Sequence, residues 1–257
     1  MAARTQESAP GPRVTPADRE RFERDGYLVI EEPVAPPSIL DGIVEALRGF
    51  YGKPLDERDG VVYYRNRIQD AWKIDQGVRA LALAPSVLSV LEALYGRRPL
   101  PFQTLNFRIG SQQRAHSDAI HFNSKPEGFM CGVWVALEHV DMGNGPLVFY
   151  PRIHHLPFVT MADVGLEASE ESYGDYERHI ARLIASEELE PRFGTMRKGQ
   201  ALVWAANLLH GGAAQPDRTR SRHSQVTHYF FEGCRYWAPM TSTGEEDIRW
   251  REPRWIG

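Results

Sequence analysis

Residues 101–137 read PFQTLNFRIGSQQRAHSDAIHFNSKPEGFMCGVWVAL, and this stretch predicts both the fold and the main site of the chain. Its two ends, residues 101–108 and 129–137, are short runs rich in aromatic and β-branched side chains, which is typical of buried β-strands. Between them lie His116 and Asp118. Alternate side chains of an extended segment point the same way, so this imidazole and carboxylate would face one side. That spacing suits two ligands of one metal ion.

Composition narrows the class of protein. The 257 residues are enough to bury a substantial core in one large β domain or two smaller ones. A formal net charge of −4 indicates no basic surface for nucleic acid, and no apolar run approaches membrane-spanning length. Residues 1–14 are expected to be a floppy tail without the apolar core of a secretion signal. Cys131 and Cys234 make no disulfide framework, and together these features favour a cytoplasmic protein.

The pattern changes from mainly helical to mainly extended near residue 100. Helical patterns cover residues 15–25, 38–51, 65–84 and 85–95, with a polar loop at 53–60. Strand patterns cover residues 27–30, 61–64, 101–108, 129–137, 146–150, 192–196, 200–204 and 225–236. We therefore predict a mainly β fold with a helical layer, in one domain at 15–257. It would have a helical part at 15–100, a barrel core at 101–240 and a helical insertion at 161–190.

Three further polar residues follow the His-x-Asp pair, which alone would also fit a surface turn. His210 comes after a buried strand and before two glycines, where the chain must pass close to another segment. Arg222 lies twelve residues after His210, and Ser224 follows two residues later. A guanidinium beside a hydroxyl suits a carboxylate. Two histidines and one carboxylate leave three positions of a metal open, as in the facial triad of non-haem iron(II) oxygenases.

In order and spacing, the sequence resembles the 2-oxoglutarate-dependent oxygenases, specifically the phytanoyl-CoA dioxygenase family, from about Ala17 to Tyr236. The matching motifs are His116-x-Asp118, Asn144-Gly145-Pro146-Leu147 ahead of Pro151, His210-Gly211 and Arg222-x-Ser224. The resemblance implies a double-stranded β-helix, a cupin-like jelly roll, that uses iron(II), 2-oxoglutarate and dioxygen. It implies that His116, Asp118 and His210 bind the iron. It also implies that Arg222, assisted by Ser224, binds the distal carboxylate of 2-oxoglutarate.

Other pocket residues are less specific. Trp134 matches a cosubstrate-pocket position of the family, and Gln103 and Asn106 are further candidates; core packing or strand hydrogen bonding is the alternative for all three. Cations that could meet an anionic substrate group are Arg65, Arg67, Lys73, Arg108 and Lys125, with solvated surface charge as the alternative. Lys125 is favoured because it follows the His-x-Asp pair in a loop bounded by glycine and proline. The other histidines considered, interpreted as surface, core or supporting residues, are His121, His154, His155, His223 and His228.

The resemblance implies a dioxygenase that hydroxylates an unactivated C–H bond of a small-molecule metabolite and releases succinate and carbon dioxide. Related halogenases carry a small residue where this chain has Asp118, which argues against halogenation. The family usually shows Pro-Gly-Ser-His where this chain has residues 151–154, PRIH, so that loop is expected to differ. Neither the substrate nor the oligomeric state is specified by the sequence, and the insertion fits either a lid or a passive surface excursion. Two alternatives remain open: a cupin-like isomerase or hydrolase that holds zinc, and a non-catalytic barrel that binds a small molecule or a protein.

Overall fold

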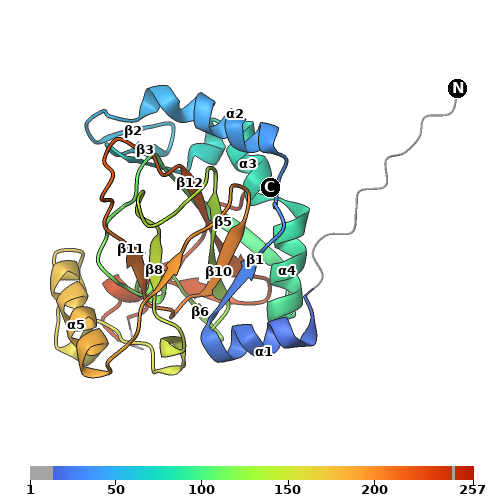
Figure 1. Cartoon of the computed structure of the whole chain (residues 1–257). Coiled ribbons are helices and arrows are strands. Elements are labelled where there is room, and N and C mark those ends of the chain that lie inside the picture. Colours follow the sequence, from blue (N-terminus) through green and yellow to red (C-terminus); the bar gives the residue numbers. More distant parts are fainter. Residues whose placement is uncertain (1–13, 245–246) are drawn as a thin grey trace, which may run out of the picture.

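A large antiparallel sheet organises the computed structural model, which describes residues 14–244 and 247–257 (Figure 1). Its strands are β1 (Tyr27–Ile30), β2 (Asp56–Arg58), β3 (Val61–Tyr63), β4 (Arg67–Gln69), β5 (Pro99–Phe107), β7 (Met130–Ala136), β10 (Ala201–Ala205) and β12 (Ser224–Phe231). Across the described residues these eight strands run in the order β1-β10-β7-β12-β5-β4-β3-β2. Strands from both ends of the sequence therefore share one sheet, while all but one residue of the expected tail at 1–14 lies outside the described residues.

Two small antiparallel sheets accompany the large one. Their strands are β8 (Leu147–Phe149), β9 (Arg192–Gly194) and β11 (His210–Gly212) in the first, and β6 (Asn123–Lys125), β13 (Arg235–Trp237) and β14 (Trp250–Arg251) in the second. Leu147 and Phe149 of the first small sheet pack in one apolar cluster with Trp134, Trp204 and Val226 of the large sheet. We call the side of the large sheet that carries these three residues its inner face. Two facing antiparallel sheets give the predicted jelly roll.

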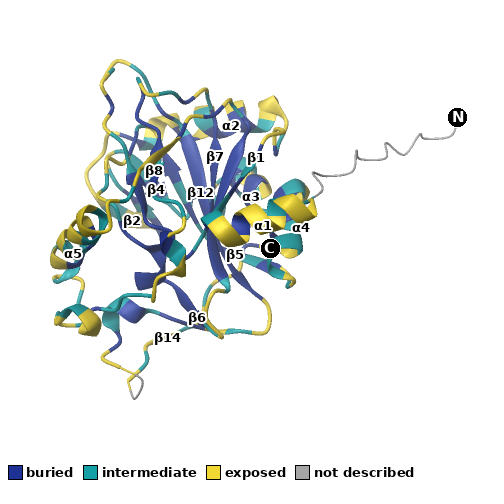
Figure 2. Cartoon of the chain, turned by 60° about the horizontal axis from the view of Figure 1, so that its bottom comes forward, coloured by how far each residue is buried: buried dark blue, intermediate teal, exposed yellow. Residues whose placement is uncertain are grey.

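Helices cover the opposite, outer face of the large sheet. They are α1 (Pro16–Asp25), α2 (Pro37–Leu47), α3 (Gln76–Ala82) and α4 (Pro85–Tyr95); a further helix, α5 (Tyr173–Ser186), packs on the other side, in the apolar cluster of the inner face. Ile43 of α2, Val78 of α3 and Leu91 of α4 form a cluster with Val133 and Val203, whose side chains alternate with those of the inner face. Figure 2 shows the result: the central strands β7 and β12 are buried along their length, and the helices are exposed on their outward sides. The expected helical layer is confirmed.

Residues 53–84 follow the prediction only in part: the strand expected at 61–64 is β3, but the polar loop expected at 53–60 contains β2 and the helical segment expected at 65–84 begins with β4. Asp56–Arg58 and Val61–Tyr63 form a hairpin around Asp59 and Gly60, which both have positive φ. Two such residues between short strands are typical of a tight hairpin turn. Arg67–Gln69 is a strand on the edge of β5, and the helix α3 begins only at residue 76. Ile68 is buried between two polar residues, and this alternation is typical of a strand rather than of the helix that we predict.

One apolar stretch also differs from the prediction. Among the described residues, Gln76–Tyr95 is apolar and long enough to span a bilayer by composition. It contains two helices, α3 and α4, which are separated at residues 83–84 just before Pro85. Their apolar side chains are largely those that pack on the outer face of the sheet, so the core accounts for the composition of the stretch.

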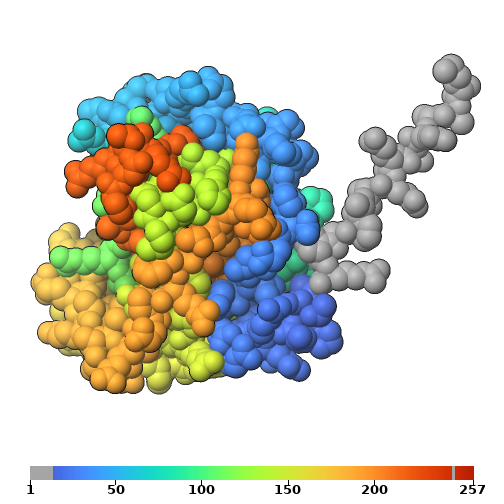
Figure 3. Space-filling model, in the orientation of Figure 1, coloured from blue at the N-terminus to red at the C-terminus, as the bar shows by residue number. Residues whose placement is uncertain are grey.

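The C-terminal half largely follows the predicted pattern. The strands expected at 101–108, 129–137 and 200–204 are β5, β7 and β10 within two residues at each end. The single strand expected at 225–236 is two strands, β12 and β13, because the chain turns at Gly233 with φ of 77°. The helix expected in the 161–190 insertion is α5, and in Figure 3 this part of the chain, yellow to light orange, forms the lower left of the surface.

Candidate metal centre

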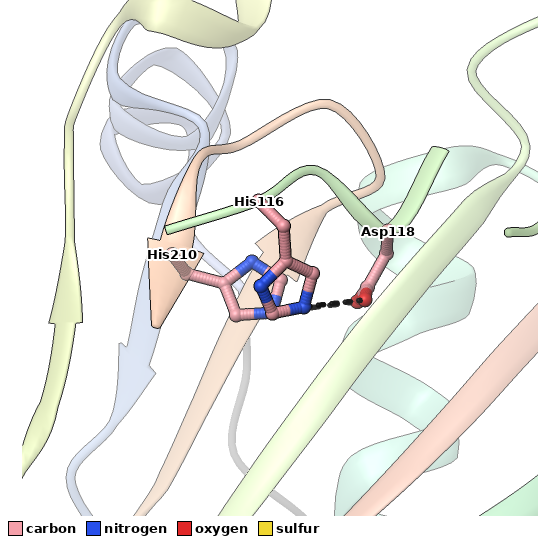
Figure 4. Close-up of side chains that lie close together, drawn as sticks. All are labelled: His116, Asp118 and His210. Carbon is pink, nitrogen blue, oxygen red and sulfur yellow. Dashed lines mark ion pairs between the residues drawn. The ribbon is translucent and has the colours of Figure 1, made fainter. Parts of the chain in front are cut away.

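His116, Asp118 and His210 come together inside the barrel, as the sequence predicts. One possible ligand atom from each lies within 4.8 Å of the other two, and all three residues are buried (Figure 4). The His116 Nε2 atom is 3.8 Å from Asp118 Oδ1, and the His210 Nε2 atom is 3.7 Å from Asp118 Oδ2. The spacing leaves room for an ion between three donor atoms that are each a ligand type for iron or zinc.

The backbone holds the two histidines opposite each other. The N–H of each donates to the C=O of the other, at 2.9 and 3.0 Å, in a single bridge between a loop and the start of β11. The Nδ1 atom of His116 lies 2.9 Å from the Arg114 carbonyl, and that of His210 lies 3.0 Å from the Leu208 carbonyl. A ring that donates from Nδ1 to a carbonyl carries its free lone pair on Nε2, which faces the centre in both cases.

Glycines allow the two segments to approach so closely. A Cβ atom on Gly211 would lie 2.7 Å from the Gln113 carbonyl oxygen, and one on Gly212 would lie 2.6 Å from the Gln112 nitrogen. Any other residue would push the loop that carries His116 away from β11. The prediction that the chain passes close to another segment after His210 is therefore confirmed.

The electrostatics of the centre favour a cation. Burial, together with the neighbouring His210, lowers the pKa of His116 to about 3, so this ring is neutral near pH 7. Burial alone raises the pKa of Asp118, but His210, His228 and His116 outweigh it, and the pKa lies below its usual range. The result is a buried carboxylate facing the lone pairs of two rings. Such an arrangement is unfavourable unless a positive charge lies between them, so these residues fit a divalent metal ion.

Arg222 lies on the inner face at the other end of the site. Its Nε donates to the Gly145 carbonyl at 3.1 Å, and its Nη1 donates to Ser224 Oγ at 2.6 Å. The guanidinium lies 5.4 Å from the ring centre of Trp134. The same-face geometry expected for Arg222 and Ser224 is thus present, and the Asn144-Gly145 turn supplies a backbone acceptor.

Arg222 is buried and has no acidic partner among the described residues. Within the described part of the chain, no carboxylate lies within salt-bridge distance of its guanidinium, and the buried Nε1–H of Trp134 has no hydrogen-bond partner. Burial lowers the pKa of Arg222 to about 10, which still leaves it charged near pH 7. A buried cation and an unsatisfied donor side by side are costly unless an anionic ligand accepts from them. The neighbouring Arg220 is instead paired with Asp141 through two 2.9 Å bonds.

The structure places the two less specific pocket candidates, Gln103 and Asn106, on opposite faces of β5. Gln103 lines the cavity beside the triad and is hydrogen-bonded to His228. Asn106 points to the outer face, where its Nδ2 donates to Gln225 Oε1 at 3.1 Å, so its prediction as a pocket residue is wrong. Asn106 is three positions after Gln103 in the sequence, and an odd difference in position puts two side chains on opposite faces of a strand.

Arg108 and Lys125, two of the cations considered for substrate binding, do not line the cavity. Arg108 is exposed and lines a separate hollow with Tyr51 and His223, and Lys125 lies over Trp237 in the second small sheet. Neither of them contacts the triad cavity, and we withdraw both as substrate-binding candidates. The cation that does line this cavity is Arg67, which stacks on Tyr64 at 4.1 Å.

The cavity beside the triad has a volume of about 400 Å³ and a wall of mixed polar and apolar surface. Residues lining it that are outside the triad are Tyr64, Arg67, Gln69, Gln103, Leu105, Gln113, His121, Phe122, Glu170, Tyr173, His228 and Met240. His228 was interpreted as a supporting or core residue, yet its Nε2 lies 3.4 Å from Asp118 Oδ2. The even spacing of residues along β12 predicts the position of His228, because residues 224, 226 and 228 share the inner face with Arg222.

The insertion contributes to this wall. Glu170 and Tyr173 line the cavity, and the Tyr173 hydroxyl accepts from Gln113 Nε2 at 3.3 Å. Tyr176 and Ile180 of α5 are buried in the inner cluster, which anchors the insertion against the barrel. The insertion is therefore part of the site rather than a passive surface excursion.

Comparisons with known proteins agree with this geometry. The model of the family "Phytanoyl-CoA dioxygenase (PhyH)" matches residues 22–223. Peroxisomal phytanoyl-CoA dioxygenase from Rattus norvegicus is 24% identical over 249 residues, covering 91% of this chain and 68% of the rat protein. A probable phytanoyl-CoA dioxygenase from Caenorhabditis elegans is 28% identical over 137 residues, covering 51% of this chain and 40% of its own length.

Solved structures share the fold. EctD from S. alaskensis with bound Fe has a TM-score of 0.68 at 20% identity, covering 92% of this chain and 83% of EctD. The α-ketoglutarate-dependent epimerase SnoN from nogalamycin biosynthesis has a TM-score of 0.67 at 18% identity, covering 94% and 95%. The family model spans most of the chain and includes every residue of the triad and Arg222. The chain therefore belongs to the phytanoyl-CoA dioxygenase (PhyH) family of Fe(II)/2-oxoglutarate-dependent oxygenases.

Proposed function

We propose that this protein is an Fe(II)- and 2-oxoglutarate-dependent dioxygenase that hydroxylates an unactivated C–H bond of a polar small molecule. The observation that carries the proposal is the pairing of two features within one barrel. One is a buried triad of two imidazoles and a carboxylate; the other is a buried arginine that has no acidic partner in the described residues. A zinc hydrolase or isomerase would use the triad but gives no reason for the second feature.

Each residue has a defined part in this proposal. His116, Asp118 and His210 hold the iron, and Arg222 holds the distal carboxylate of 2-oxoglutarate with Ser224 and Trp134 beside it. The bound iron, 2-oxoglutarate and dioxygen supply an oxidant that breaks the C–H bond, with succinate and carbon dioxide as by-products. The apolar residues of the inner face exclude water, and the cavity wall orients the substrate carbon toward the metal.

The substrate class follows from the wall of the cavity. Amide, imidazole, phenol and guanidinium groups outnumber the apolar side chains, so the cavity suits a molecule with several hydrogen-bonding groups. Arg67 is the side chain suited to an anionic group of that molecule, because no carboxylate in the described chain pairs with it. The acyl-CoA in the relatives' names is not carried over to this protein.

Hydroxylation is the outcome that we propose, and Asp118 weighs specifically against halogenation. Solved neighbours include an epimerase and a carbocyclase, so the fold does not select one reaction. Asp118 fills the position that a halide would need, which favours oxygen transfer over halogenation. A cytoplasmic location stays a prediction, since relatives in the comparison are named peroxisomal.

A succinate-release assay with iron(II), 2-oxoglutarate and a panel of polar metabolites tests the proposal. The expected result is substrate-dependent succinate and a product that gains one oxygen, even in high chloride, as measured by mass spectrometry. The partly exposed His154→Ala variant is the matched control and should keep this activity. A chlorinated product, or turnover that needs zinc and no dioxygen, would contradict the proposal.

A further inference from the structure

Four residues on neighbouring strands form a row across the inner face, directly beside Asp118. Trp204 of β10 is opposite Gly132 of β7, Gly132 is opposite His228 of β12, and His228 is opposite Gln103 of β5. None of the four is part of the triad. Cross-strand neighbours on one face lie close enough to contact each other, so the row acts as one unit.

The indole of Trp204 contacts two members of the triad. Its Nε1–H donates to Asp118 Oδ2 at 2.8 Å, and its ring centre lies 4.6 Å from that of His210. Gly132 makes this placement possible, because a Cβ atom there would lie 2.3 Å from the indole carbons Cε2 and Cζ2. The indole therefore lies over the glycine, in space that any larger residue would occupy.

His228 approaches the same oxygen from the other side of Gly132. Its Nε2 is 3.4 Å from Asp118 Oδ2, and its Nδ1 is 3.0 Å from Gln103 Oε1, which fixes the ring plane. The other oxygen, Asp118 Oδ1, accepts no hydrogen bond from the described residues, and the nearest ring nitrogen, His116 Nε2, lies 3.8 Å away. The two oxygens of one carboxylate thus have different surroundings.

From this asymmetry we infer that Trp204 and His228 are positioning residues that make Asp118 a one-oxygen ligand of the iron through Oδ1. This inference rests on the proposed function. An oxygen that accepts an indole N–H has less electron density to offer a metal, whereas Oδ1 is free to bind. The consequence matters for catalysis. With one oxygen from Asp118, a six-coordinate iron keeps three positions for the two oxygens of 2-oxoglutarate and for dioxygen; with two, one of these positions is lost.

Cobalt(II) binding tests the inference without turnover. Trp204→Phe keeps the aromatic ring and removes the N–H, and we expect about 10- to 100-fold weaker cobalt binding, as is typical when a partner of a ligand is lost. The visible spectrum of bound cobalt should also change, because a carboxylate free to bind through both oxygens displaces another ligand of the six-coordinate ion. His228→Leu should shift both readouts in the same direction by less. Trp237→Phe, which removes a buried indole N–H outside the row, is the matched control and should change neither.

The outcomes separate this inference from the function it rests on. If Trp204→Phe and His228→Leu are folded by circular dichroism and bind cobalt with wild-type affinity and spectrum, the inference is wrong. If Trp204→Phe does not fold, the same measurements on His228→Leu decide. If the wild-type protein binds cobalt no better than His210→Ala does, the proposed metal centre itself fails.

Discussion

Both faces of the large sheet are buried along β7 and β12, but the inner face is more open on β1, β4 and β5, and the two faces serve different ends. On β7 the outer side chains are Cys131, Val133 and Val135, which pack against helices, while the inner positions include Gly132 and Trp134, which shape the site. The outer face needs side chains of the right volume. The inner face needs particular atoms in particular places, such as an N–H toward Asp118 or a missing Cβ under an indole.

Burial of a polar group does not by itself mark a functional residue. Asn106, Gln225 and Thr227 are buried on the outer face, where Asn106 donates to Gln225 and Gln225 donates to the Val78 carbonyl of α3. Those bonds tie the sheet to a helix. Arg222 is buried as deeply on the inner face, yet part of its guanidinium faces no protein acceptor. The difference lies in charge: Asn106 Oδ1 also lacks a partner, but the outer-face groups are neutral, whereas Arg222 is a buried cation without an acidic partner among the described residues, which is far more costly.

The largest expected effect is at the metal. His210→Ala removes the triad ligand on β11 and should abolish stoichiometric iron(II) binding, measured anaerobically by equilibrium dialysis. The fold should persist, because the backbone bridge to His116 needs no side chain. Stoichiometric iron in a folded His210→Ala variant would remove this residue from the site.

The second-largest expected effect is on the affinity for 2-oxoglutarate. Arg222→Ala should weaken it about 30- to several-thousand-fold, since removing one partner of a buried charged pair costs about 2–5 kcal/mol. Iron binding should be retained. Arg222→Lys should rescue poorly, because a point charge does not reproduce the guanidinium fork. Calorimetric titration of 2-oxoglutarate into the iron-loaded protein measures this under nitrogen.

Arg220→Ala is the matched control for that experiment. Arg220 lies two residues away but is bonded to Asp141 at the surface, so its loss should leave the affinity for 2-oxoglutarate unchanged. A large loss in Arg220→Ala with none in Arg222→Ala would reverse the assignment of the two arginines.

A smaller effect is expected for the helper hydroxyl. Ser224→Ala removes one hydrogen bond to Arg222 and should raise the Michaelis constant for 2-oxoglutarate about 2- to 10-fold, equivalent to about 0.5–1.5 kcal/mol. The turnover number should change less than the Michaelis constant. An effect as large as that of Arg222→Ala would mean that Ser224 binds the cosubstrate independently.

The outer face should show no binding effect at all. Ile68→Val, between the inward-facing Arg67 and Gln69, should lower the free energy of unfolding by about 0.5–1.5 kcal/mol through a lost buried methylene. Urea denaturation measures that change, and iron and 2-oxoglutarate affinities should stay at wild-type values. A weakened affinity for either would show that the two faces are not independent.

The sequence by itself determined which side chains could act together on a strand. Arg222, Ser224 and His228 have the even spacing that puts them on one face, and the same rule excludes Asn106 from the face of Gln103. The triad was predictable because its residue types suit one metal and because its two parts flank recognisable strands. Apolar and β-branched runs likewise predicted β5, β7 and β10.

Only the tertiary structure decided which separate segments meet. Arg108 and Lys125 suit an anionic group by residue type, but Arg108 lines a separate hollow and Lys125 packs over Trp237 in the second small sheet. The contact between Trp204 and Asp118 joins residues 86 positions apart, and it depends on a glycine in a third segment. Local periodicity records the face of a strand, which is set by backbone geometry. It does not predict strand order or loop direction, because these follow from how the whole core packs.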